Sequence, residues 1–394
     1  MKSFLASVAL SLLSLTTIVQ AQNPYKLTKT YAGPTFFDDW IYYNNFDNLT
    51  NGDAIFVSKE VATADNLTFI NSAGNAVIRV DNFTQVPFNI KRNTVRISTA
   101  QQYGVGSVWT ADMIHGPFGC SVWPAWWSQS LTWPAGGEID TFENVNQATA
   151  NQISLHTNPG CSLSNTANFT GNVISSDCSA TANNNQGCIV ADNSNGAFGQ
   201  SFSANGGGVF VTEYAATYIA VWFLPRASIP SPLNDDSATT LDTSTIGEPL
   251  VNYTNAGCNI AEFFTAQELI LDITLCGDFA GNPMIFNETC QGVCYNDFVI
   301  GPPSNYDNAY FEIRNIKVFQ NDAAISASGS SSSSSSSGSG SNSGSGSSSS
   351  SGSSSGSNSD SPSGGTKNSA SGMSIMSTGF ISLLGAALLG STLL

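Results

Sequence analysis

A long tract of serine and glycine limits how much of this chain can fold. From residue 328 to residue 357 only these two residue types occur, apart from Asn342. The tract has no apolar side chain to bury, so it cannot offset the entropy cost of ordering. We expect a disordered stalk over residues 323–372 and one folded domain over residues 22–322. The expected folded segment is long for one domain, but single all-β domains of such length are common.

Short strand-like segments recur through the expected domain. They are rich in Val, Ile, Thr and aromatic residues and are separated by clusters of Gly, Pro, Asn and Ser, a pattern typical of β-strands and turns. Examples are residues 76–80, 94–98, 152–156, 218–223, 268–274 and 310–319. Long amphipathic helical patterns are scarce. The sequence therefore predicts an all-β sandwich.

Both ends of the chain are typical of targeting signals. Residues 1–21 carry Lys2, an apolar run and then small residues, as in a cleaved secretory signal peptide. Residues 373–394 end in an apolar tail behind a polar spacer, as in a GPI-anchor signal, or alternatively a retained anchoring helix. We expect the anchor at Asn368, and the alternative attachment sites are Gly364, Gly365, Ser369 and Ser371. The expected location is the cell surface, on the plasma membrane through a lipid anchor, or the cell wall.

Cysteines and sequons agree with secretion. The eight cysteines are Cys120, Cys161, Cys178, Cys188, Cys258, Cys276, Cys290 and Cys294. An even number in an oxidising compartment indicates disulfides, with about 105 possible pairings. Glycosylation is expected at Asn48, Asn66, Asn82, Asn168, Asn252 and Asn287. Paired Cys-x-x-Cys spacing is mostly lacking and only two histidines occur, so we expect no metal or cofactor.

The charge balance narrows the class of binding partner. The formal net charge is −16, which makes a nucleic acid a poor partner. A neutral polysaccharide carries no such penalty. Charged residues and aromatic residues each make up 10% of the chain. This balance suits a protein that holds sugars by stacking rather than by ion pairing. We expect the protein to act as a monomer.

Three acids in one short segment are the most informative motif. Glu138 and Asp140 share a face of a strand, because side chains alternate with a period of two. Glu143 joins them only if one extra residue is inserted as a β-bulge near Thr141 and Phe142. A solvated strand edge is the structural alternative. The apolar residues between the acids and four tryptophans upstream argue against it.

Paired carboxyl groups are what glycoside hydrolysis requires. In retaining enzymes the two groups lie about 5 Å apart, and their mutual repulsion separates their pKa values. We predict that Glu138 is the nucleophile and that Glu143 protonates the leaving oxygen and then activates water. Asp140 is expected to hydrogen-bond Glu138 and to help keep Glu143 protonated.

The motif Gly-Glu138-Ile-Asp140-Thr-Phe-Glu143 resembles the bulged signature of glycoside hydrolase family 16, in its laminarinase branch. The resemblance extends to the segments 123–127, 155–157, 222–226 and 276–281 and covers about residues 31–319. It implies a bent β-jelly-roll sandwich of the concanavalin A type, with a glucan cleft across the concave sheet. It also implies an endo-β-glucanase that cleaves β-1,3 or mixed β-1,3/1,4 glucan with retention.

The same resemblance assigns further residues. It implies Arg96, Trp127 and Trp133 as substrate contacts, and His156 beside the catalytic strand as a partner of Asp140 or of substrate. Taken alone, Arg96 would be a surface or ion-pair residue, His156 a structural histidine, and each tryptophan a candidate for the core. Trp123 and Trp126 are further core candidates, and Trp127 shares the face of Trp123 unless Pro124 alters the strand. Fungal members of the family often have Trp at the position of Phe279, so we expect weaker stacking of the glucan at one subsite.

Two other functions fit the pattern. A wall-remodelling transglycosylase would pass the covalent intermediate to a second glucan, although wall transglycosylases of this family usually carry the unbulged spacing. A non-catalytic β-glucan-binding wall protein would share the stalk and anchor. Such a protein would be expected to lose a glutamate, yet both glutamates are present.

Overall fold

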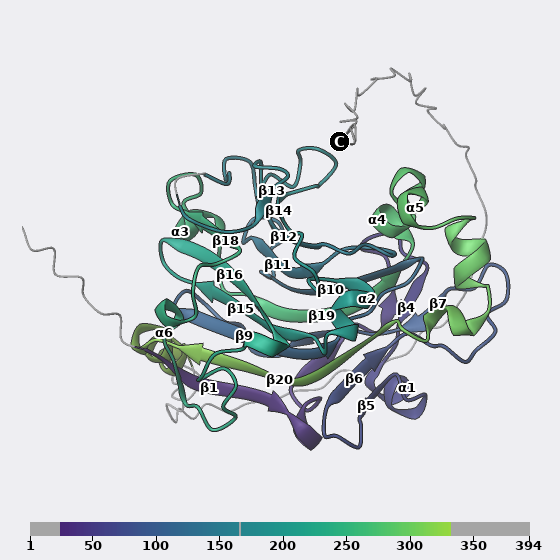
Figure 1. The fold of residues 1–394 in the computed structure, drawn as a ribbon, viewed down its shortest axis with the longest axis horizontal. Coiled ribbons are helices and arrows are strands. Elements are labelled where there is room, and N and C mark those ends of the chain that lie inside the picture. Colours follow the sequence, from purple (N-terminus) through teal and green to yellow (C-terminus); the bar gives the residue numbers. More distant parts are fainter. Residues whose placement is uncertain (1–23, 165–166, 332–394) are drawn as a thin grey trace, which may run out of the picture. The chain divides into compact units, whose positions relative to one another are not determined.

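The computed structural model describes residues 24–164 and 167–331. Within this part, two large antiparallel sheets lie face to face, and a small third sheet lies at one end (Figure 1). The predicted all-β sandwich of the jelly-roll type is confirmed. Each described helix has ten residues or fewer, in agreement with the scarcity of helical patterns.

The first large sheet has nine strands. Seven follow the order β17-β1-β20-β9-β15-β16-β18, and β6 pairs with both β20 and β5. Its strands are β1 (Tyr25–Ala32), β5 (Thr68–Ile70), β6 (Ala76–Arg79), β9 (Ser107–His115), β15 (Gly208–Tyr214), β16 (Tyr218–Pro225), β17 (Thr240–Leu241), β18 (Val251–Thr254) and β20 (Tyr310–Gln320).

The second large sheet has eight strands in the order β13-β14-β12-β11-β10-β19-β8-β2. The strands are β2 (Trp40–Tyr42), β8 (Arg96–Thr99), β10 (Val122–Gln129), β11 (Glu138–Glu143), β12 (Asn151–His156), β13 (Asn172–Val173), β14 (Cys188–Asp192) and β19 (Glu268–Leu275). The acidic motif thus lies on a central strand, β11, between β10 and β12.

The remaining elements are short. The third sheet consists of β3 (Asn45–Phe46), β4 (Ala54–Phe56) and β7 (Arg92–Thr94). The α-helices are α1 (Lys59–Ala64), α2 (Gly199–Ala204), α3 (Ile260–Phe263), α4 (Gly277–Ala280), α5 (Pro283–Thr289) and α6 (Asp322–Ser331). Other helical turns are η1 (Gly33–Thr35), η2 (Arg226–Ser228), η3 (Thr243–Thr245), η4 (Cys294–Val299) and η5 (Pro303–Tyr306).

The main core fills the space between the two large sheets. Phe142 of β11 packs there against the rings of Phe198, Phe202, Phe210 and Phe311, at centroid distances of 4.7–6.0 Å. A smaller apolar cluster includes residues of β1, β9, β15, β16, β17 and β20 of the nine-stranded sheet. Burial of this apolar surface is the main force that holds the sheets together.

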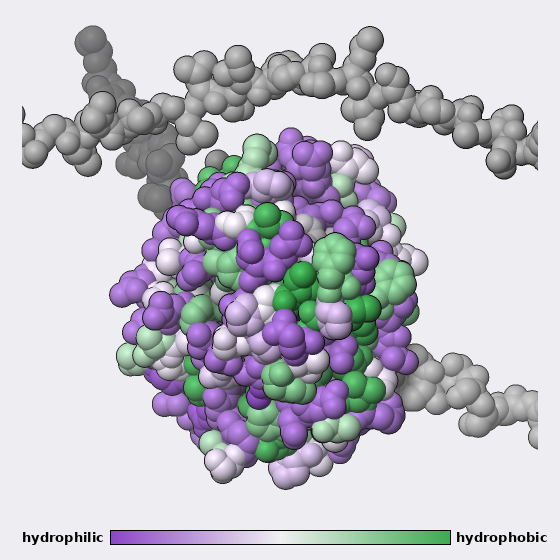
Figure 2. All heavy atoms as spheres, turned by 90° about the vertical axis from the view of Figure 1, so that its right-hand side faces the viewer, coloured by the Kyte–Doolittle hydropathy of each residue, from purple (hydrophilic) through white to green (hydrophobic). Residues whose placement is uncertain are grey.

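One end of the sandwich, at the right of Figure 1, carries α4, α5, β4 and β7. Figure 2 looks onto this end and shows apolar residues gathered in one area of a largely polar face. In the connecting segments, Phe88 and Ile90 are exposed, and the ring of Phe88 meets Tyr295 edge-on at 6.1 Å. The hydroxyl of Tyr295 donates to the carbonyl of Ile90, so these segments support each other.

The strands predicted from the sequence are present, with one interruption. Residues 94–98 were expected to form one strand, but β7 ends at Thr94 and β8 begins at Arg96. The side chain of Val95 is fully buried at this break. The chain passes there from the small sheet to the eight-stranded sheet, because β7 pairs with β4 while β8 pairs with β19 and β2.

All eight cysteines form disulfides, as the sequence predicted. The pairs are Cys120–Cys290, Cys161–Cys258, Cys178–Cys188 and Cys276–Cys294. The sequence had left this pairing open. The sequon asparagines Asn48, Asn66, Asn168 and Asn287 are exposed, whereas Asn82 and Asn252 are half-buried. Glycosylation remains a prediction at all six.

The predicted stalk begins with a helix rather than with disordered chain. Helix α6 covers residues that we had assigned to the stalk from residue 323 onward. Asn321 explains this start, because its side chain accepts a hydrogen bond from the N–H of Ala324 at 2.9 Å, and Lys26 pairs with Asp322 at 2.6 Å. Such a cap satisfies a backbone donor that the first turn leaves free.

Several predicted segments lie outside the described residues. They are the signal peptide over residues 1–21, the rest of the stalk, Asn368 and the tail over residues 373–394. Among the described residues, none of the helices has the length and apolar character needed to cross a membrane.

Candidate active site

A β-bulge in β11 brings the three acids to one face of the sheet. On β12, Asp140 pairs with Ser154 and Glu143 pairs with Gln152, so two residues of β11 lie opposite one residue of β12. The register with β10 shifts at the same place. The extra residue reverses the alternation after Asp140. The bulge predicted at Thr141 and Phe142 is therefore confirmed.

Both residues of the bulge point into the core. Thr141 is buried and its hydroxyl hydrogen-bonds that of Thr212 at 2.8 Å, while Phe142 packs in the aromatic core. Ile139 is fully buried as well. The side chains of Glu138, Asp140 and Glu143 consequently lie on the outer face of the eight-stranded sheet, opposite the core.

Each glutamate accepts a hydrogen bond from an indole N–H. Trp123 of β10 donates to Oε1 of Glu143 at 2.7 Å, and Trp133, in the loop before β11, donates to Oε2 of Glu138. Both glutamates are only partly exposed. A donor on each carboxylate fixes its rotamer while a second oxygen stays available for chemistry.

Asp140 is held by β12. It is buried and accepts a hydrogen bond from the hydroxyl of Ser154 at 2.5 Å, and Nε2 of His156 lies 3.3 Å from the same oxygen. The predicted pairing of His156 with Asp140 is thus observed. Among the described hydrogen bonds, Asp140 makes none to Glu138, in contrast to our expectation. The reason is the register, which places Ser154 directly opposite Asp140.

His156 lies at the centre of this charge cluster. It pairs in register with Glu138, and one ligand atom each of Glu138, Asp140 and His156 lie within 4.8 Å of one another. Its other ring nitrogen, Nδ1, lies 3.0 Å from the side-chain oxygen of Asn185. Each ring nitrogen of His156 thus has a side-chain oxygen within reach.

The electrostatics of the cluster favour protonated carboxyl groups and a cationic histidine. Burial and the charge of Asp140 raise the pKa of Glu143 to about 8. Burial and Asp140 likewise raise the pKa of Glu138, although His156 and the N–H of Trp133 act against this shift. Burial disfavours the charged form of His156, but the charges of Glu138, Asp140 and Glu143 prevail and raise its pKa to about 10.

A buried ion pair lies on β8 and β19, on the other side of β10 from the acids. Arg96 of β8 donates from Nη1 to Asp272 of β19 at 2.8 Å, and the other oxygen of Asp272 accepts the indole N–H of Trp127 at 3.2 Å. The guanidinium of Arg96 also lies over the rings of Trp127 and Tyr43, at 4.8 and 5.5 Å from their centroids. Arg96 is therefore fixed in orientation rather than free on the surface.

The tryptophans divide between the two faces of β10. Trp126 is in the core, whereas Trp123 and Trp127 are half-buried on the face that carries the acids, as period-two alternation predicted. Trp133 is 45% exposed. Phe279 of α4 meets the ring of Trp123 edge-on at 5.4 Å, so it borders the same face. The structure thus brings Trp123, Trp127 and Trp133 to the acids.

Several residues of this site were missed by the sequence reasoning. Asp272, Ser154 and Asn185 were not singled out, and Trp123 was weighed only as core. Asp272 had a signal, since it is one acid in the otherwise apolar run 269–273. Asn185 had no such signal in the sequence, because the residue it contacts, His156, is 29 positions away.

A comparison of the whole sequence with known families decides the family. The description "XgeA-like, catalytic GH16 domain" matches residues 40–319, which is most of the chain.

The chain belongs to glycoside hydrolase family 16. Among curated family members, a protein named "probable endo-1,3(4)-beta-glucanase" from Neosartorya fischeri is 36% identical over 333 residues. This match covers 82% of the present chain and 50% of that protein. The chain thus spans about half the length of the curated relatives it matches.

Two solved structures of the family are similar over the folded part. Laminarinase 16A from Phanerochaete chrysosporium, described with β-glucans in both donor and acceptor sites, is 33% identical with a TM-score of 0.72. A second structure, described as an elongating family 16 β-1,3-glucosyltransferase, is 34% identical with a TM-score of 0.69. The matches cover 76% and 75% of this chain and all of the other chain.

Proposed function

We propose that this chain is an endo-β-glucanase that hydrolyses β-1,3 or mixed β-1,3/1,4 glucan with retention of configuration. The observation that carries the proposal is the bulge in β11. It leaves Glu138 and Glu143 on one face, each with an indole donor. Burial raises the pKa of Glu143 to about 8, whereas the charge of His156 and the indole N–H of Trp133 favour the ionised form of Glu138. Two such carboxyl groups are the machinery of double displacement.

Glu138 is the nucleophile in this proposal. It lies beside the His156 ring, whose positive charge favours the ionised carboxylate that attack on an anomeric carbon needs. Bond formation to Glu138 releases the leaving oxygen, which takes the proton of Glu143. In the second step Glu143, now ionised, removes a proton from water, and that water displaces Glu138 from the sugar.

Glu143 suits the role of general acid. Its pKa of about 8 keeps it protonated at neutral pH, mainly because it is buried and because the negative charge of Asp140 lies nearby. Asp140 therefore acts on the chemistry through its charge. An acid with a pKa near the working pH transfers its proton most effectively.

The substrate cleft is proposed to cross the outer face of the eight-stranded sheet. Trp127 and Trp133 offer rings on which the apolar faces of glucose units stack, and Arg96 offers guanidinium donors to sugar hydroxyls. The relative from Phanerochaete chrysosporium is described with glucan in donor and acceptor sites, which supports glucan as the partner here. We further propose action as a monomer at the cell surface, on a lipid anchor.

Parallel digestion of laminarin, lichenan and a pure β-1,4 glucan tests the proposal. We expect reducing ends from laminarin or lichenan and none from the β-1,4 glucan. Glu138→Ala should abolish turnover but retain glucan binding in affinity electrophoresis. Unchanged turnover in this variant would refute the nucleophile assignment.

Transfer to a second glucan is the other candidate reaction. The structural match to a described β-1,3-glucosyltransferase is nearly as good as the match to the laminarinase. Both outcomes share the same covalent intermediate and differ in whether water or a sugar hydroxyl attacks it. A labelled acceptor distinguishes them, since transfer would give labelled oligosaccharides in excess of reducing ends.

A non-catalytic glucan-binding protein is the third candidate. It predicts saturable binding to laminarin without any product from wild-type protein. Both glutamates and their tryptophan donors are retained, which favours catalysis over binding alone.

A further inference from the structure

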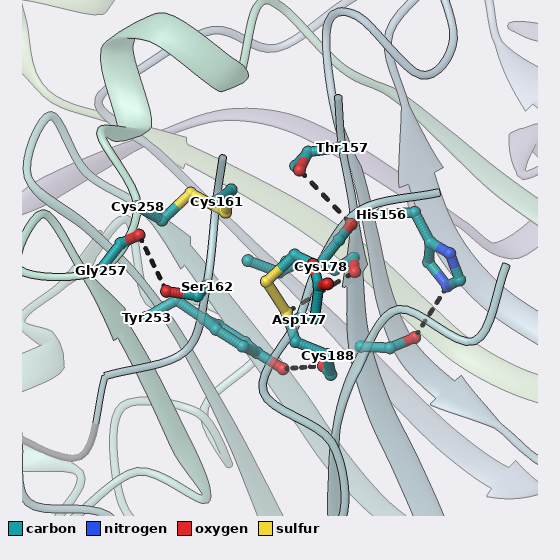
Figure 3. The surroundings of a disulfide bond; sticks show 12 residues. His156, Thr157, Cys161, Ser162, Asp177, Cys178, Cys188, Tyr253, Gly257 and Cys258 are labelled. Carbon is teal, nitrogen blue, oxygen red and sulfur yellow. Dashed lines mark hydrogen bonds between the residues drawn. A yellow bond between two sulfur atoms is a disulfide. The ribbon is translucent and has the colours of Figure 1, made fainter. Parts of the chain in front are cut away.

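A disulfide-closed loop lies directly beside His156. Cys178 and Cys188 are bonded, and they enclose the segment 179–187 (Figure 3). Both ends of the loop are tied to the chain around β12. Thr157, directly after His156, forms a β-bridge with Ser179, and Cys188 pairs with Leu155. The loop is thus anchored on both sides of the histidine.

The loop holds an unusual backbone conformation. Asn183, Asn184 and Asn185 have φ angles of 48°, 58° and 62°, which is the left-handed region. Asparagine tolerates this region better than most residues, but three in succession carry a cost. Strained backbone of this kind persists only where surrounding contacts hold it, and it concentrates at functional sites.

The backbone conformation of the loop places the side chain of Asn185 against the ring of His156. The side-chain oxygen of Asn185 lies 3.0 Å from Nδ1 of His156, while Nε2 faces Asp140 at 3.3 Å. An amide oxygen only accepts, so Nδ1 must donate. Nε2 faces the carboxylate of Asp140 and also lies 3.3 Å from the hydroxyl oxygen of Ser154. Because that hydroxyl donates its hydrogen to Asp140, both oxygens near Nε2 act as acceptors, and Nε2 carries a proton as well. The two contacts together select the doubly protonated ring.

Gly187 allows the loop to approach this closely. A β-carbon at this position would lie 2.8 Å from Cε1 and from Nε2 of His156, and its φ angle is +71°. Any side chain there would push the ring or the loop away. Only glycine fits at such a contact.

We propose that Asn185 is a positioning residue that holds His156 as an imidazolium cation, and that the Cys178–Cys188 disulfide fixes it there. The proposal rests on the function proposed above, since the cation stabilises ionised Glu138. The charged groups that face His156 are Glu138, Asp140 and Glu143, all on β11. Asn185 adds the acceptor on the opposite side of the ring, from a separate element.

The test is a pair of glycine substitutions in the loop. Glycine adopts positive φ freely, so Asn185→Gly removes the amide without adding backbone strain, and Asn184→Gly is the matched control. NMR titration of the imidazole signals reports on His156 directly. The chain has only two histidines, so a His115→Gln background leaves one signal.

We expect Asn185→Gly to lower the measured pKa of His156 by about one unit, a tenfold change in proton affinity. Since the pKa of His156 is about 10, the ring keeps its charge at neutral pH, but without its acceptor it is no longer held in place beside Glu138. We therefore expect kcat to fall about tenfold and the acidic limb of the kcat/KM profile to move to higher pH. KM should stay within about twofold. Asn184→Gly should change none of these quantities.

Two further variants separate positioning from general loss of structure. Asn185→Asp keeps an acceptor oxygen and should restore the pKa of His156 to the wild-type value or above it. The double variant Cys178→Ala, Cys188→Ala frees the loop and should shift His156 in the same direction as Asn185→Gly. Near-UV circular dichroism verifies the fold of each variant.

The proposal is overturned if Asn185→Gly leaves the pKa of His156 within 0.2 units of wild type, or if Asn184→Gly has an equal effect. It is also overturned if Asn185→Asp fails to restore that pKa. The titration needs no substrate. If the wild-type protein cleaved no glucan, the proposed function would fail while this measurement would still decide the role of Asn185.

Discussion

Thr141 of β11 and Thr212 of β15 join the two sheets through a hydrogen bond of 2.8 Å between their buried hydroxyl groups. Thr141 occupies the bulge, so this bond marks the point where the alternation of β11 reverses. It holds one residue of the bulge in the core, and Glu143 is thereby turned to the outer face beside Asp140. A contact inside the core thus sets the position of an acid outside it.

Replacing Thr141 with Val should destabilise the protein by roughly 1–2 kcal/mol, because the hydroxyl of Thr212 then remains buried without its partner. The shape of the side chain is nearly unchanged. The double variant Thr141→Val, Thr212→Val should recover most of this loss. Urea unfolding measures the free energy of each variant. If the double variant lost as much stability as the two single variants together, the role of the bond would be contradicted.

Replacing Glu143 with Gln should stabilise the protein above neutral pH. Wild-type Glu143 keeps its proton up to about pH 8 in the folded state, mainly because of burial, whereas the unfolded chain releases it near its ordinary value of 4.5. Between these values the folded state binds more protons than the unfolded state, so wild-type stability falls as pH rises.

We therefore expect the Tm advantage of Glu143→Gln to be small at pH 4 and several degrees at pH 8, at about 2–4 °C per kcal/mol. Turnover should be lost. Thermal unfolding followed by circular dichroism at both pH values measures the difference. A variant no more stable than wild type at pH 8 would contradict a raised pKa for Glu143.

Replacing Trp123 with Phe should move the basic limb of the pH–rate profile to higher pH. Burial raises the pKa of Glu143, and the hydrogen bond from Trp123 counteracts this by favouring the carboxylate. Without that donor the proton is held more tightly, by roughly half a unit to one unit. The kcat/KM profile on laminarin measures the limb.

Trp126→Phe is the matched control for that variant. Trp126 lies on the same strand but points into the core, so its replacement should lower stability and leave the basic limb in place. A limb that moved equally in both variants, or that moved to lower pH in Trp123→Phe, would disprove the assignment of this donor.

Replacing Asp272 with Asn should cost roughly 2–4 kcal/mol of unfolding free energy, because Arg96 then remains buried without a counter-charge. The double variant Arg96→Met, Asp272→Leu removes both charges and should lose less than the single variant. Guanidinium unfolding provides the comparison. Asp272→Asn should also raise KM, since the single amide oxygen cannot accept from both Arg96 and Trp127, as the two carboxylate oxygens do. A single variant as stable as wild type would show that the pair is already solvated.

The sequence predicted the main features of the fold because they depend on local pattern. Runs of Val, Ile, Thr and aromatic residues between turn residues, such as 218–223 and 310–319, predicted the strands, and an even number of cysteines predicted disulfides. The spacing of Glu138, Asp140 and Glu143 even required the bulge, since a regular strand cannot place all three on one face. These inferences need only neighbours in the chain.

Tertiary structure decided which distant groups meet. The disulfide pairs, the partnership of Arg96 with Asp272 and the approach of Asn185 to His156 join positions 10 to 176 residues apart. Such contacts depend on the order and register of strands in the sheet, and a one-residue shift would reverse the face of every side chain. The sequence by itself determined which chemical groups were available on β11, and the packing of the two sheets determined which partners set their charge.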